Sequence, residues 1–473
     1  MITGKTLQAH GWPPGKVIGI AKAIATRLEA SGLKQEAILT RLEAVRASPS
    51  AYIDDPMLGS LADAWLLRQA NQPAEREELR ERPLDYAVWG QDQIDPAALA
   101  QMENALRLPV AAAGALMPDA HVGYGLPIGG VLATANAVIP FAVGVDIACR
   151  MRLSVYPVPP ETLRKQQQQF EKALLDQTRF GVGSSWQRRE RPEHEVLGDP
   201  AWQSTKLLQS LLSKGEEQLG TSGTGNHFVE WGVFRLYADD EQLGLKADEY
   251  LALLSHSGSR GVGFKVANAF TETAQRLHPT LDKGLRHLAW LSLESEPGQE
   301  YWLSMELAGR FASANHYVIH HRVARAVGLE EATHVENFHN FAWREQLPDG
   351  TNVIVHRKGA TPAGLGVMGV IPGSMGDAGY VVRGLGHVRA LNSAAHGAGR
   401  RMSRRAALDS ISKSARDAYL RERDVKLLGG AIDESPQAYK DIESIIAAQD
   451  ELVEVIGKFT PRIVRMADEA GEY

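Results

Sequence analysis

The sequence predicts an α+β protein in which a helical N-terminal region precedes one large body of strands, helices and glycine-rich loops. Apolar residues recur at helical spacing through the first eighty residues, whereas short apolar runs typical of strands appear later. The chain has 473 residues, 44% of them hydrophobic, which is enough to bury a large core. Many of its 45 glycines stand near His, Asn or Ser, as in loops that approach ligands.

The N-terminal region, residues 1–82, is expected to form amphipathic helices, and Ile24 and Leu28 illustrate the spacing. No residue in it suggests catalysis. The charged run 75–82 marks the predicted boundary with a catalytic domain over residues 83–473.

Within this domain, residues 116–130 are predicted to form a glycine-rich loop and residues 137–143 a strand that leads to the single cysteine. Residues 265–325 are expected to be rich in helix. The tail after Ser403 is expected to form a basic helix and then an acidic helix.

Composition excludes several classes of protein. A single cysteine rules out an internal disulfide framework and favours the cytoplasm. No apolar run is long enough to cross a bilayer, and the N-terminus lacks the apolar core of a signal peptide. A net charge of −6 excludes a protein that coats nucleic acid by bulk charge, so any contact with nucleic acid needs a local basic cleft.

Asp146 and Cys149 are the central candidates for chemistry. Their spacing puts a hard oxygen and a soft sulfur within reach of one transition metal. A lone cysteine is more often a small buried apolar residue, but four histidines on Gly- or Asn-flanked turns follow it. They are His227, His256, His339 and His396. Zn, Mn and Fe all suit these ligands, and their wide separation favours a catalytic site over a structural zinc site.

Four segments combine exposed backbone N–H groups with a basic or hydroxyl side chain, which suits phosphate. They are residues 257–261, 356–359, 372–376 and 397–400. None is a Walker loop or a dinucleotide fingerprint. A metal site beside phosphate-binding loops indicates nucleotidyl or phosphoryl transfer.

An ordered series of motifs resembles the RtcB-type RNA-splicing ligases over residues 85–439. The motifs are Met-Pro-Asp119-x-His121-x-Gly-Tyr-Gly, Gly144-Val-Asp146-Ile-x-Cys149, Gly225-Asn226-His227-Phe-x-Glu230, His256-x-Gly-Ser-Arg260-Gly and His396-Gly-Ala-Gly-Arg400, with His339-Asn340 and His356-Arg-Lys-Gly-Ala-Thr361. This resemblance implies a large single body of packed β-sheets with surrounding helices and a deep metal-binding cleft.

The resemblance also implies an enzyme that joins RNA 3′-phosphate or 2′,3′-cyclic phosphate ends to 5′-hydroxyl ends through a covalent histidine–GMP intermediate, in RNA repair or tRNA splicing. It implies two Mn²⁺ ions per active site and GTP, with ATP as an alternative nucleotide. The expected partners are RNA ends, GTP and an activating protein, with no membrane, and the chain is expected to be a monomer or weak dimer. Two other functions compete: a two-metal phosphatase or nuclease without nucleotidylation, and a non-catalytic RNA-end binder.

The resemblance assigns roles to individual residues. His396 would be the nucleophile, with Asp119 as a second catalytic residue. Cys149 would bridge two metals, one completed by His256 and His339 and the other by Asp146 and His227. The implied nucleotide contacts are Asn226, Glu230, His339, Asn340, Pro372, Gly373, Ser374, Met375, His396, Gly397, Ala398, Gly399 and Tyr439. The implied phosphate or RNA contacts are Arg260, Lys358 and Arg400.

The chain departs from the family pattern at several positions. Arg150 stands beside the bridging cysteine where the family has glycine, and Pro362 replaces an arginine. Gly379 replaces a base-contacting serine. Met466, with Arg465 beside it, stands near the position of a lysine that contacts guanine in the family. These departures are the reason for keeping ATP as an alternative.

Overall fold

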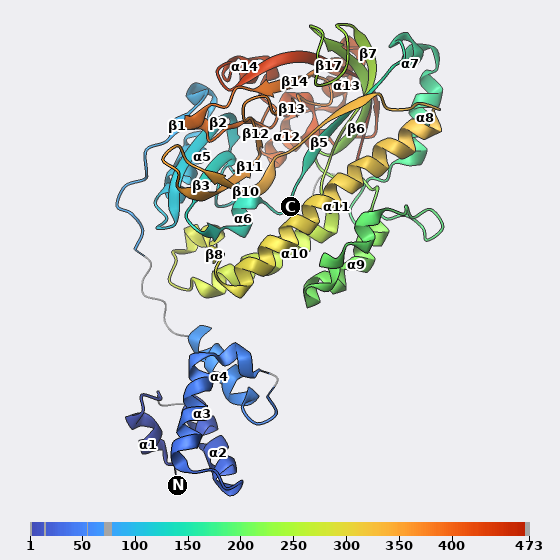
Figure 1. Cartoon of the computed structure of the whole chain (residues 1–473). Helices are drawn as coiled ribbons and strands as arrows, with labels where there is room; N and C mark the ends of the chain where they lie inside the picture. The colour runs from blue at the N-terminus through green and yellow to red at the C-terminus, as the bar shows by residue number, and fades with distance from the viewer. Residues whose placement is uncertain (1, 14–15, 54, 71–77, 469–473) are drawn as a thin grey trace. The chain divides into compact units, whose positions relative to one another are not determined.

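The computed structural model describes residues 2–13, 16–53, 55–70 and 78–468. The chain divides into two compact units, residues 1–76 and 77–473, which are described separately (Figure 1). The predicted boundary run 75–82 lies partly outside the described residues, and the assignment of a catalytic domain to residues 83–473 stays a prediction. No described helix is long and apolar enough to cross a bilayer.

The first unit is a small helical bundle. Its helices are α1 (Gly4–Ala9), α2 (Lys16–Ala30), α3 (Gln35–Ala47) and α4 (Gly59–Ala70). One face of α3 buries Ile38, Leu42 and Val45, whose spacing of four and three residues places them on one side of the helix. The indole rings of Trp12 and Trp65 meet edge to face, with centroids 5.3 Å apart, and join the same core.

The main sheet of the second unit has its central strands in the order β14-β17-β6-β7-β5-β9, with β13 outside β14 and β16 beside β17. The strands are β5 (Arg150–Tyr156), β6 (Phe228–Leu236), β7 (Glu249–Ser257), β9 (Thr333–Phe338), β13 (Met368–Ile371), β14 (Gly379–Gly384), β16 (Lys426–Leu428) and β17 (Val453–Met466). The Asn337 side chain joins the two edges of this sheet. Its Oδ1 accepts from Val370 N at 2.8 Å and its Nδ2 donates to Val370 O at 3.3 Å. The sheet is therefore nearly closed.

A second sheet has the strand order β1-β2-β3-β11-β10. Its strands are β1 (Ala87–Val88), β2 (Ala111–His121), β3 (Ile128–Thr134), β10 (Asn340–Gln346) and β11 (Asn352–Lys358). The prediction of a loop over residues 116–130 was too long, because β2 continues to His121 and only residues 122–127 separate it from β3. The β2–β3 register shifts between Leu116 and His121. This irregularity in the pairing lies in the part of β2 that was predicted to be loop.

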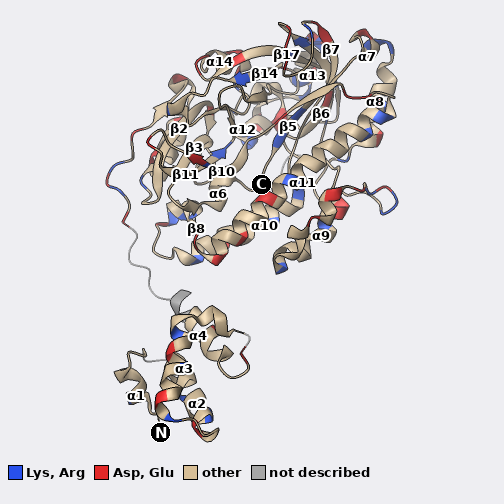
Figure 2. Ribbon diagram, in the orientation of Figure 1, with Lys and Arg blue, Asp and Glu red and all other residues tan. Residues whose placement is uncertain are grey.

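Two long helices, α10 (Arg260–Leu277) and α11 (Glu296–Ala326), run side by side (Figure 1), and α11 packs on strands β5 and β7 of the main sheet. The first turn of α11 is capped by Ser295, whose hydroxyl accepts from Gly298 N at 3.2 Å. The remaining helices are α5 (Pro96–Leu106), α6 (Pro140–Val143), α7 (Glu161–Lys165), α8 (Gln167–Gln177), α9 (Lys206–Gln218), α12 (Arg404–Ser410), α13 (Lys413–Glu422) and α14 (Ile442–Ala447). Basic and acidic residues are interspersed along the helices and strands of this unit (Figure 2).

Two predicted elements differ in the structure. Only Ala137–Val138 is a strand, β4, which pairs with β8 (Leu291–Ser292), and the short helix α6 follows because Pro140 suits a first helical turn. The tail forms α12 and α13 as expected, and the acidic helix is limited to the short α14, with Glu443 in its first turn. The described part of the tail then forms β17, because its alternating apolar side chains fit between β14 and β6. The strands β12 (Ala360–Pro362) and β15 (Ser393–Ala395) form a separate pair. The predicted α+β class is confirmed.

Candidate active site and metal centre

Five predicted metal ligands come together at the ends of strands of the main sheet. Cys149 directly precedes β5, His227 directly precedes β6, His256 lies in β7 and His339 follows β9. With Asp146 they form two groups that share the cysteine. The groups are Cys149, His256 and His339, and Asp146, Cys149 and His227, and within each group the ligand atoms lie within 4.8 Å of one another.

The donor atoms converge closely. Cys149 Sγ lies 3.1 Å from His256 Nε2 and 3.4 Å from His227 Nε2. His256 Nε2 lies 3.2 Å from His339 Nε2, and His227 Nε2 lies 3.1 Å from Asp146 Oδ2. The cysteine and all three histidines are at most 4% exposed. Electron-rich atoms are therefore packed together out of bulk water.

Backbone carbonyls set the orientation of two of the imidazoles. His227 Nδ1 donates to Ser222 O at 2.8 Å, and His256 Nδ1 donates to Asn226 O at 3.1 Å. In the neutral form each ring then presents the lone pair of Nε2 to the cluster, and this is an atom that can ligate a metal.

Burial also favours neutral rings. Burial, with His227 and His396 nearby, holds the pKa of His256 well below its usual range. Burial does the same to the pKa of His339, whose Nδ1 has no hydrogen-bond partner among the described residues. Neutral imidazole is the form that ligates metal.

His396 follows β15 and lies against the metal cluster, its ring centroid 4.8 Å from that of His339. Its Nδ1 donates to Asp119 Oδ2 at 2.6 Å, and its backbone N donates to the same oxygen at 3.1 Å. Asp119 is fully buried in β2. This double contact fixes the ring with Nδ1 as the donor, so that in the neutral ring Nε2 carries the lone pair that a nucleophile requires.

Close packing of two backbone segments brings His396 and Asp119 together. Gly399 has φ +73°, and a Cβ there would lie 2.1 Å from Asp119 O. Only glycine allows this approach. Lys440 Nζ donates to the carbonyls of Pro118 and Ala120, at 3.1 and 2.8 Å, and so holds the backbone on both sides of the buried carboxylate.

Asn315 on α11 is a supporting residue that the sequence analysis missed. Its Oδ1 accepts from Gly220 N at 2.7 Å, and its Nδ2 donates to Thr221 O at 3.0 Å and to Ser257 Oγ at 3.2 Å. It therefore ties the loop before His227 to the end of β7 that carries His256. No local pattern marks this asparagine, because its partners lie about 60 and 95 residues away.

The predicted nucleotide loops are neighbours. Residues 372–375 connect β13 to β14, residues 397–399 follow β15, and a Cβ on Gly397 would lie 3.3 Å from Pro372 O. Met375 is buried in the core of the main sheet, so its side chain supports the loop. Ser374 Oγ accepts from Gly376 N at 3.3 Å and donates to Asp377, an acidic residue that the sequence analysis missed.

Glu230 is an unusual member of the predicted nucleotide set. It lies in β6, is 3% exposed, and its Oε2 has no hydrogen-bond partner among the described residues. Burial raises the pKa of its carboxyl well above the usual range. A buried polar group of this kind is costly unless a ligand satisfies it. Asn226, four residues earlier, contributes its carbonyl to His256.

Arg400 and Tyr439 form part of an internal network. Arg400 Nη2 donates to Asp433 O at 2.8 Å, and its Nη1 lies 3.3 Å from Glu434 and 3.4 Å from the Tyr439 hydroxyl. That hydroxyl also donates to Glu434. Both predicted ligand contacts are therefore already engaged with protein groups, which leaves few donors for a phosphate.

The other predicted contacts lie around the metal cluster. Arg260 begins α10, and its Nη1 lies 3.3 Å from His227 Nδ1. When Nδ1 donates its hydrogen to Ser222 O, it cannot also accept one from Arg260. Asn340 connects two segments, donating to Asp146 O at 3.3 Å and accepting from Gly359 N at 2.9 Å. Lys358 ends β11, and its Nζ donates to Tyr124 O at 2.5 Å.

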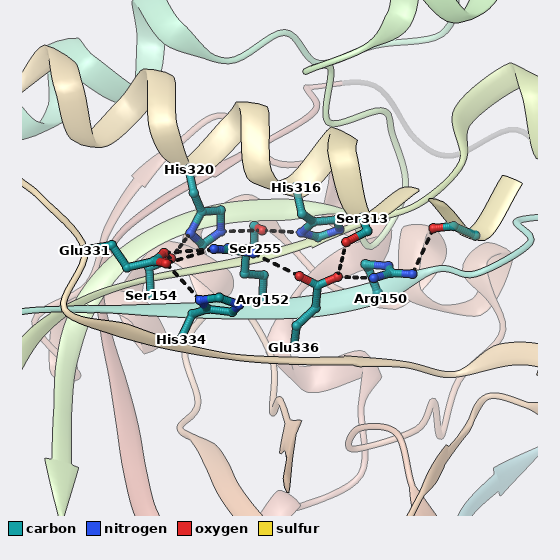
Figure 3. Close-up of polar contacts among 11 residues, drawn as sticks. Arg150, Arg152, Ser154, Ser255, Ser313, His316, His320, Glu331, His334 and Glu336 are labelled. Atoms are coloured by element: carbon teal, nitrogen blue, oxygen red, sulfur yellow. Dashed lines mark hydrogen bonds and ion pairs between the residues drawn. The ribbon is translucent and has the colours of Figure 1, made fainter. Parts of the chain in front are cut away.

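Arg150 does not place its charge at the metal cluster, contrary to the expectation from sequence. Successive strand residues project to opposite faces, so the guanidinium lies beneath α11. There it pairs with Glu336, donates to Gly309 O at 3.0 Å and lies 4.8 Å from the Phe338 ring (Figure 3). The replacement of glycine is thus accommodated by a buried ion pair.

The C-terminal departures also have structural explanations. Met466 ends β17 and is 3% exposed. Arg465 Nη1 donates to Leu428 O at 2.7 Å and to Met466 O at 2.9 Å, so this guanidinium holds β16 against β17. Pro362 ends β12, opposite Ser393 of β15.

Sequence comparison with known proteins identifies the family of this chain. The family model described as tRNA-splicing ligase RtcB matches residues 101–467. The RNA-splicing ligase RtcB of Escherichia coli K12 is 32% identical over 392 residues, covering 77% of this chain and 92% of the relative. The RNA-splicing ligase RtcB of Mycobacterium tuberculosis is 32% identical, covering 76% and 98%. The tRNA-splicing ligase RtcB of Thermococcus kodakarensis is 31% identical, covering 76% and 89%. The chain therefore belongs to the RtcB family of tRNA-splicing ligases.

Proposed function

We propose that this protein is an RNA ligase that acts in RNA repair or tRNA splicing and joins a 3′-phosphate or 2′,3′-cyclic phosphate end to a 5′-hydroxyl end. The observation that carries this proposal is the position of His396. Its free Nε2 belongs to a ring packed on the metal cluster, and Asp119 holds that ring by Nδ1. A phosphatase or nuclease needs the metals but has no use for this oriented nucleophile.

The donor set fits two manganese ions that share the Cys149 sulfur. One ion would be held by His256 and His339 and the other by Asp146 and His227, as the two ligand groups indicate. Mixed nitrogen, oxygen and thiolate donors also suit zinc and iron, so the choice of manganese rests on the family resemblance. When bound, the ions would polarise phosphate oxygens next to the nucleophile.

The first chemical step uses GTP. His396 Nε2 attacks the α-phosphorus, an N–P bond forms, the bond to the β-phosphate oxygen breaks, and pyrophosphate leaves. Asp119 keeps the proton on Nδ1 and stabilises the positive charge that develops on the ring. The GMP then passes to the RNA 3′-phosphate, and the 5′-hydroxyl attacks that activated phosphate with loss of GMP. A cyclic phosphate must first be opened by water.

Glu230 supports guanine rather than adenine as the base. Burial favours the protonated form of this carboxyl; once it releases that proton to solvent, it can accept from the N1–H and the exocyclic N2 amino group of guanine, and these contacts would satisfy the oxygen that now lacks a partner. Adenine offers an unprotonated N1 at the corresponding edge. Because neither Met466 nor Arg465 replaces the family lysine, we keep ATP as the alternative nucleotide.

The test is intact-mass spectrometry of the full chain after incubation with Mn²⁺ and either GTP or ATP. We expect a GMP adduct that is absent from His396→Ala, with metal content unchanged in that variant. An AMP adduct would preserve the mechanism and change the nucleotide. If folded, metal-loaded protein forms neither adduct, two explanations compete, a missing activator and the hydrolase; if candidate activators also fail to produce an adduct, the covalent chemistry is wrong and the hydrolase becomes the better proposal.

RNA ends and GTP are the partners that this chemistry requires, and residues 83–473 would contain the whole site. An activating protein, a monomeric or weakly dimeric state and a cytoplasmic location remain predictions from sequence. Adding candidate activators to the same labelling reaction, and measuring molar mass by light scattering, would test the first two.

A further inference from the structure

The loop between β2 and β3, residues 122–127, presents an aromatic side chain to solvent. Tyr124 is 63% exposed, although the loop that carries it is firmly held. Gln101 Nε2 donates to Gly123 O at 2.6 Å, and Gly123 N donates to Gln101 Oε1 at 3.0 Å. Gly125, with φ +71°, packs against His287 so closely that a Cβ would lie 3.0 Å from that residue. The exposed ring is therefore on a constrained backbone.

Tyr124 belongs to a cluster of three rings. Its centroid lies 6.2 Å from that of Phe141 and 5.8 Å from that of His287, and these two lie 4.5 Å from each other. His287 belongs to the 3₁₀ helix Lys283–Leu288. The cluster supports the tyrosine from one side and leaves most of its surface open. A ring held in this way can stack on a ligand without losing much conformational entropy.

A cation accompanies the rings. Lys358 Nζ lies 5.1 Å from the centre of the Phe141 ring and donates to the carbonyl of Tyr124. Aromatic rings beside a basic group are the combination with which proteins bind single-stranded nucleic acid, since bases stack on the rings and phosphates meet the cation.

Lys358 connects this cluster to the segment that packs on His396. Lys358 directly precedes Gly359, and a Cβ on that glycine would lie 3.2 Å from His396 Cε1. On the other chain segment, Tyr124 follows Asp119 by five residues, and Asp119 holds His396. The proposed base-contacting residue Glu230 belongs to the other sheet, on β6. The Tyr124 cluster and the residue proposed to contact guanine therefore belong to different sheets.

We propose that Tyr124, supported by Phe141 and His287, stacks on a base of the RNA end that is being joined, while Lys358 contacts a neighbouring phosphate. This inference rests on the proposed function and specifies how the substrate is held. Stacking on a ring is tolerant of base identity, as an enzyme that accepts many RNA ends requires.

The experiment uses the full chain with Mn²⁺ and two single-stranded RNA oligonucleotides, one ending in a 3′-phosphate and one beginning with a 5′-hydroxyl. Each carries 2-aminopurine at the terminal or the adjacent nucleotide, because stacking quenches its fluorescence. We expect quenching with one of the two ends. Tyr124→Ala should abolish it and weaken binding of that RNA by about 5- to 100-fold. Tyr124→Phe should bind almost as well as the unchanged protein.

Tyr237→Ala is the matched control, because Tyr237 is 50% exposed and follows the end of β6 opposite to His227. It should change neither quenching nor affinity. Tyr124→Ala should also form the nucleotide adduct on His396 normally. Loss of the adduct in this variant would place the ring in the nucleotide site and overturn the proposal. A normal adduct with unimpaired RNA binding would overturn the stacking role alone, whereas absence of an adduct from the unchanged protein would count against the ligase chemistry itself.

Discussion

Two polar clusters lie on opposite faces of the strands β5, β7 and β9. One contains the predicted metal ligands at the strand ends. The other lies beneath α11, where Arg150 and Arg152 meet Glu331 and Glu336 (Figure 3). At the start of β5 the two sets occupy consecutive residues, Cys149 just before the strand and Arg150 at its first position, and in β7 they meet at Ser255 and His256. Strand alternation alone separates them.

The cluster beneath α11 is balanced internally. Two guanidinium groups face two carboxylates, and the Ser255 hydroxyl lies 2.7 Å from both His316 Nδ1 and His320 Nε2. Burial lowers the pKa of His316 to about 3, so this ring is neutral. Three nitrogens of the network, His316 Nε2, Arg150 Nε and Arg152 Nε, lack a hydrogen-bond partner among the described residues. Such a network stabilises the fold and needs no ligand.

The cluster of candidate metal ligands is built differently, because imidazole nitrogens, a thiol and a carboxylate converge on one another, with the Arg260 guanidinium beside them. Converging groups of this kind are typical of a functional site. The comparison teaches that the number of charged or imidazole groups does not distinguish function from structure in this protein. What distinguishes them is the kind of neighbour: beneath α11 carboxylates face guanidinium groups, whereas at the strand ends atoms that can ligate a metal face one another.

The largest expected effect comes from Cys149→Ala, which removes the atom that both ligand groups share. Both bound cations should be lost, as measured by elemental analysis of dialysed protein. The Asp176→Ala variant, altered at an exposed ion pair, should keep them. Retention of both cations by Cys149→Ala would contradict the shared-ligand role.

Glu336→Ala should have the next largest effect, on stability. The substitution removes the carboxylate that pairs with both Arg150 and Arg152. Breaking a buried ion pair costs about 3–5 kcal/mol of folding free energy. Denaturant unfolding monitored by circular dichroism measures the loss. The exposed pair of Lys172 and Asp176 provides the control, since Asp176→Ala should cost less than about 1 kcal/mol. A similar small loss for Glu336→Ala would show that the network is not stabilising.

Glu230→Gln should have a smaller effect, restricted to nucleotide choice. It replaces one acceptor oxygen by an amide donor, so we expect the rate of adduct formation with GTP to fall roughly 10- to 100-fold. The rate with ATP should not fall in parallel. The ratio of the two rates, from time-resolved intact mass, is the measurement, and an unchanged ratio would remove Glu230 from base recognition.

The smallest effect concerns Lys358, because burial lowers the pKa of its amine to about 7. The ammonium is charged below this pKa and is lost as the pH rises through it. Compared with Lys358→Met, the unchanged protein should bind a 3′-phosphate RNA about tenfold more tightly at pH 6, and the ratio should fall toward one by pH 8. The ratio cancels the titration of the phosphate itself. A ratio independent of pH would exclude contact between this amine and the phosphate.

The residues that form the candidate metal centre could be identified from sequence because they stand in recognisable local settings. Asp146 and Cys149 are three residues apart, and each histidine has Gly or Asn near it, as strand-end ligands often do. The α+β class followed from the change of periodicity along the chain. The length of β2 and the presence of the final strand β17 could not be predicted in this way. Burial on both faces and a position in the middle of a sheet depend on neighbours that are distant in sequence.

The residues that support the site could not be predicted for the same reason. Asn315 and Asn337 act through partners that tertiary folding brings to them, and nothing beside them in the chain marks that role. The sequence indicated that Arg150 adjoins the metals, since it follows Cys149. Only the direction of β5 and the position of Glu336 show that its charge is neutralised on the other face.

By itself, the amino-acid sequence determined which chemical groups this protein has and the order in which they occur. It contains one thiol, a carboxylate three residues before it and histidines on glycine-rich turns, so metal and phosphate chemistry could be inferred without coordinates. The tertiary structure decided which of those groups share a face, which protons are already committed to backbone carbonyls, and which charges are paired. These properties depend on distances of a few ångströms between residues that are far apart in the chain, and local sequence patterns do not contain them.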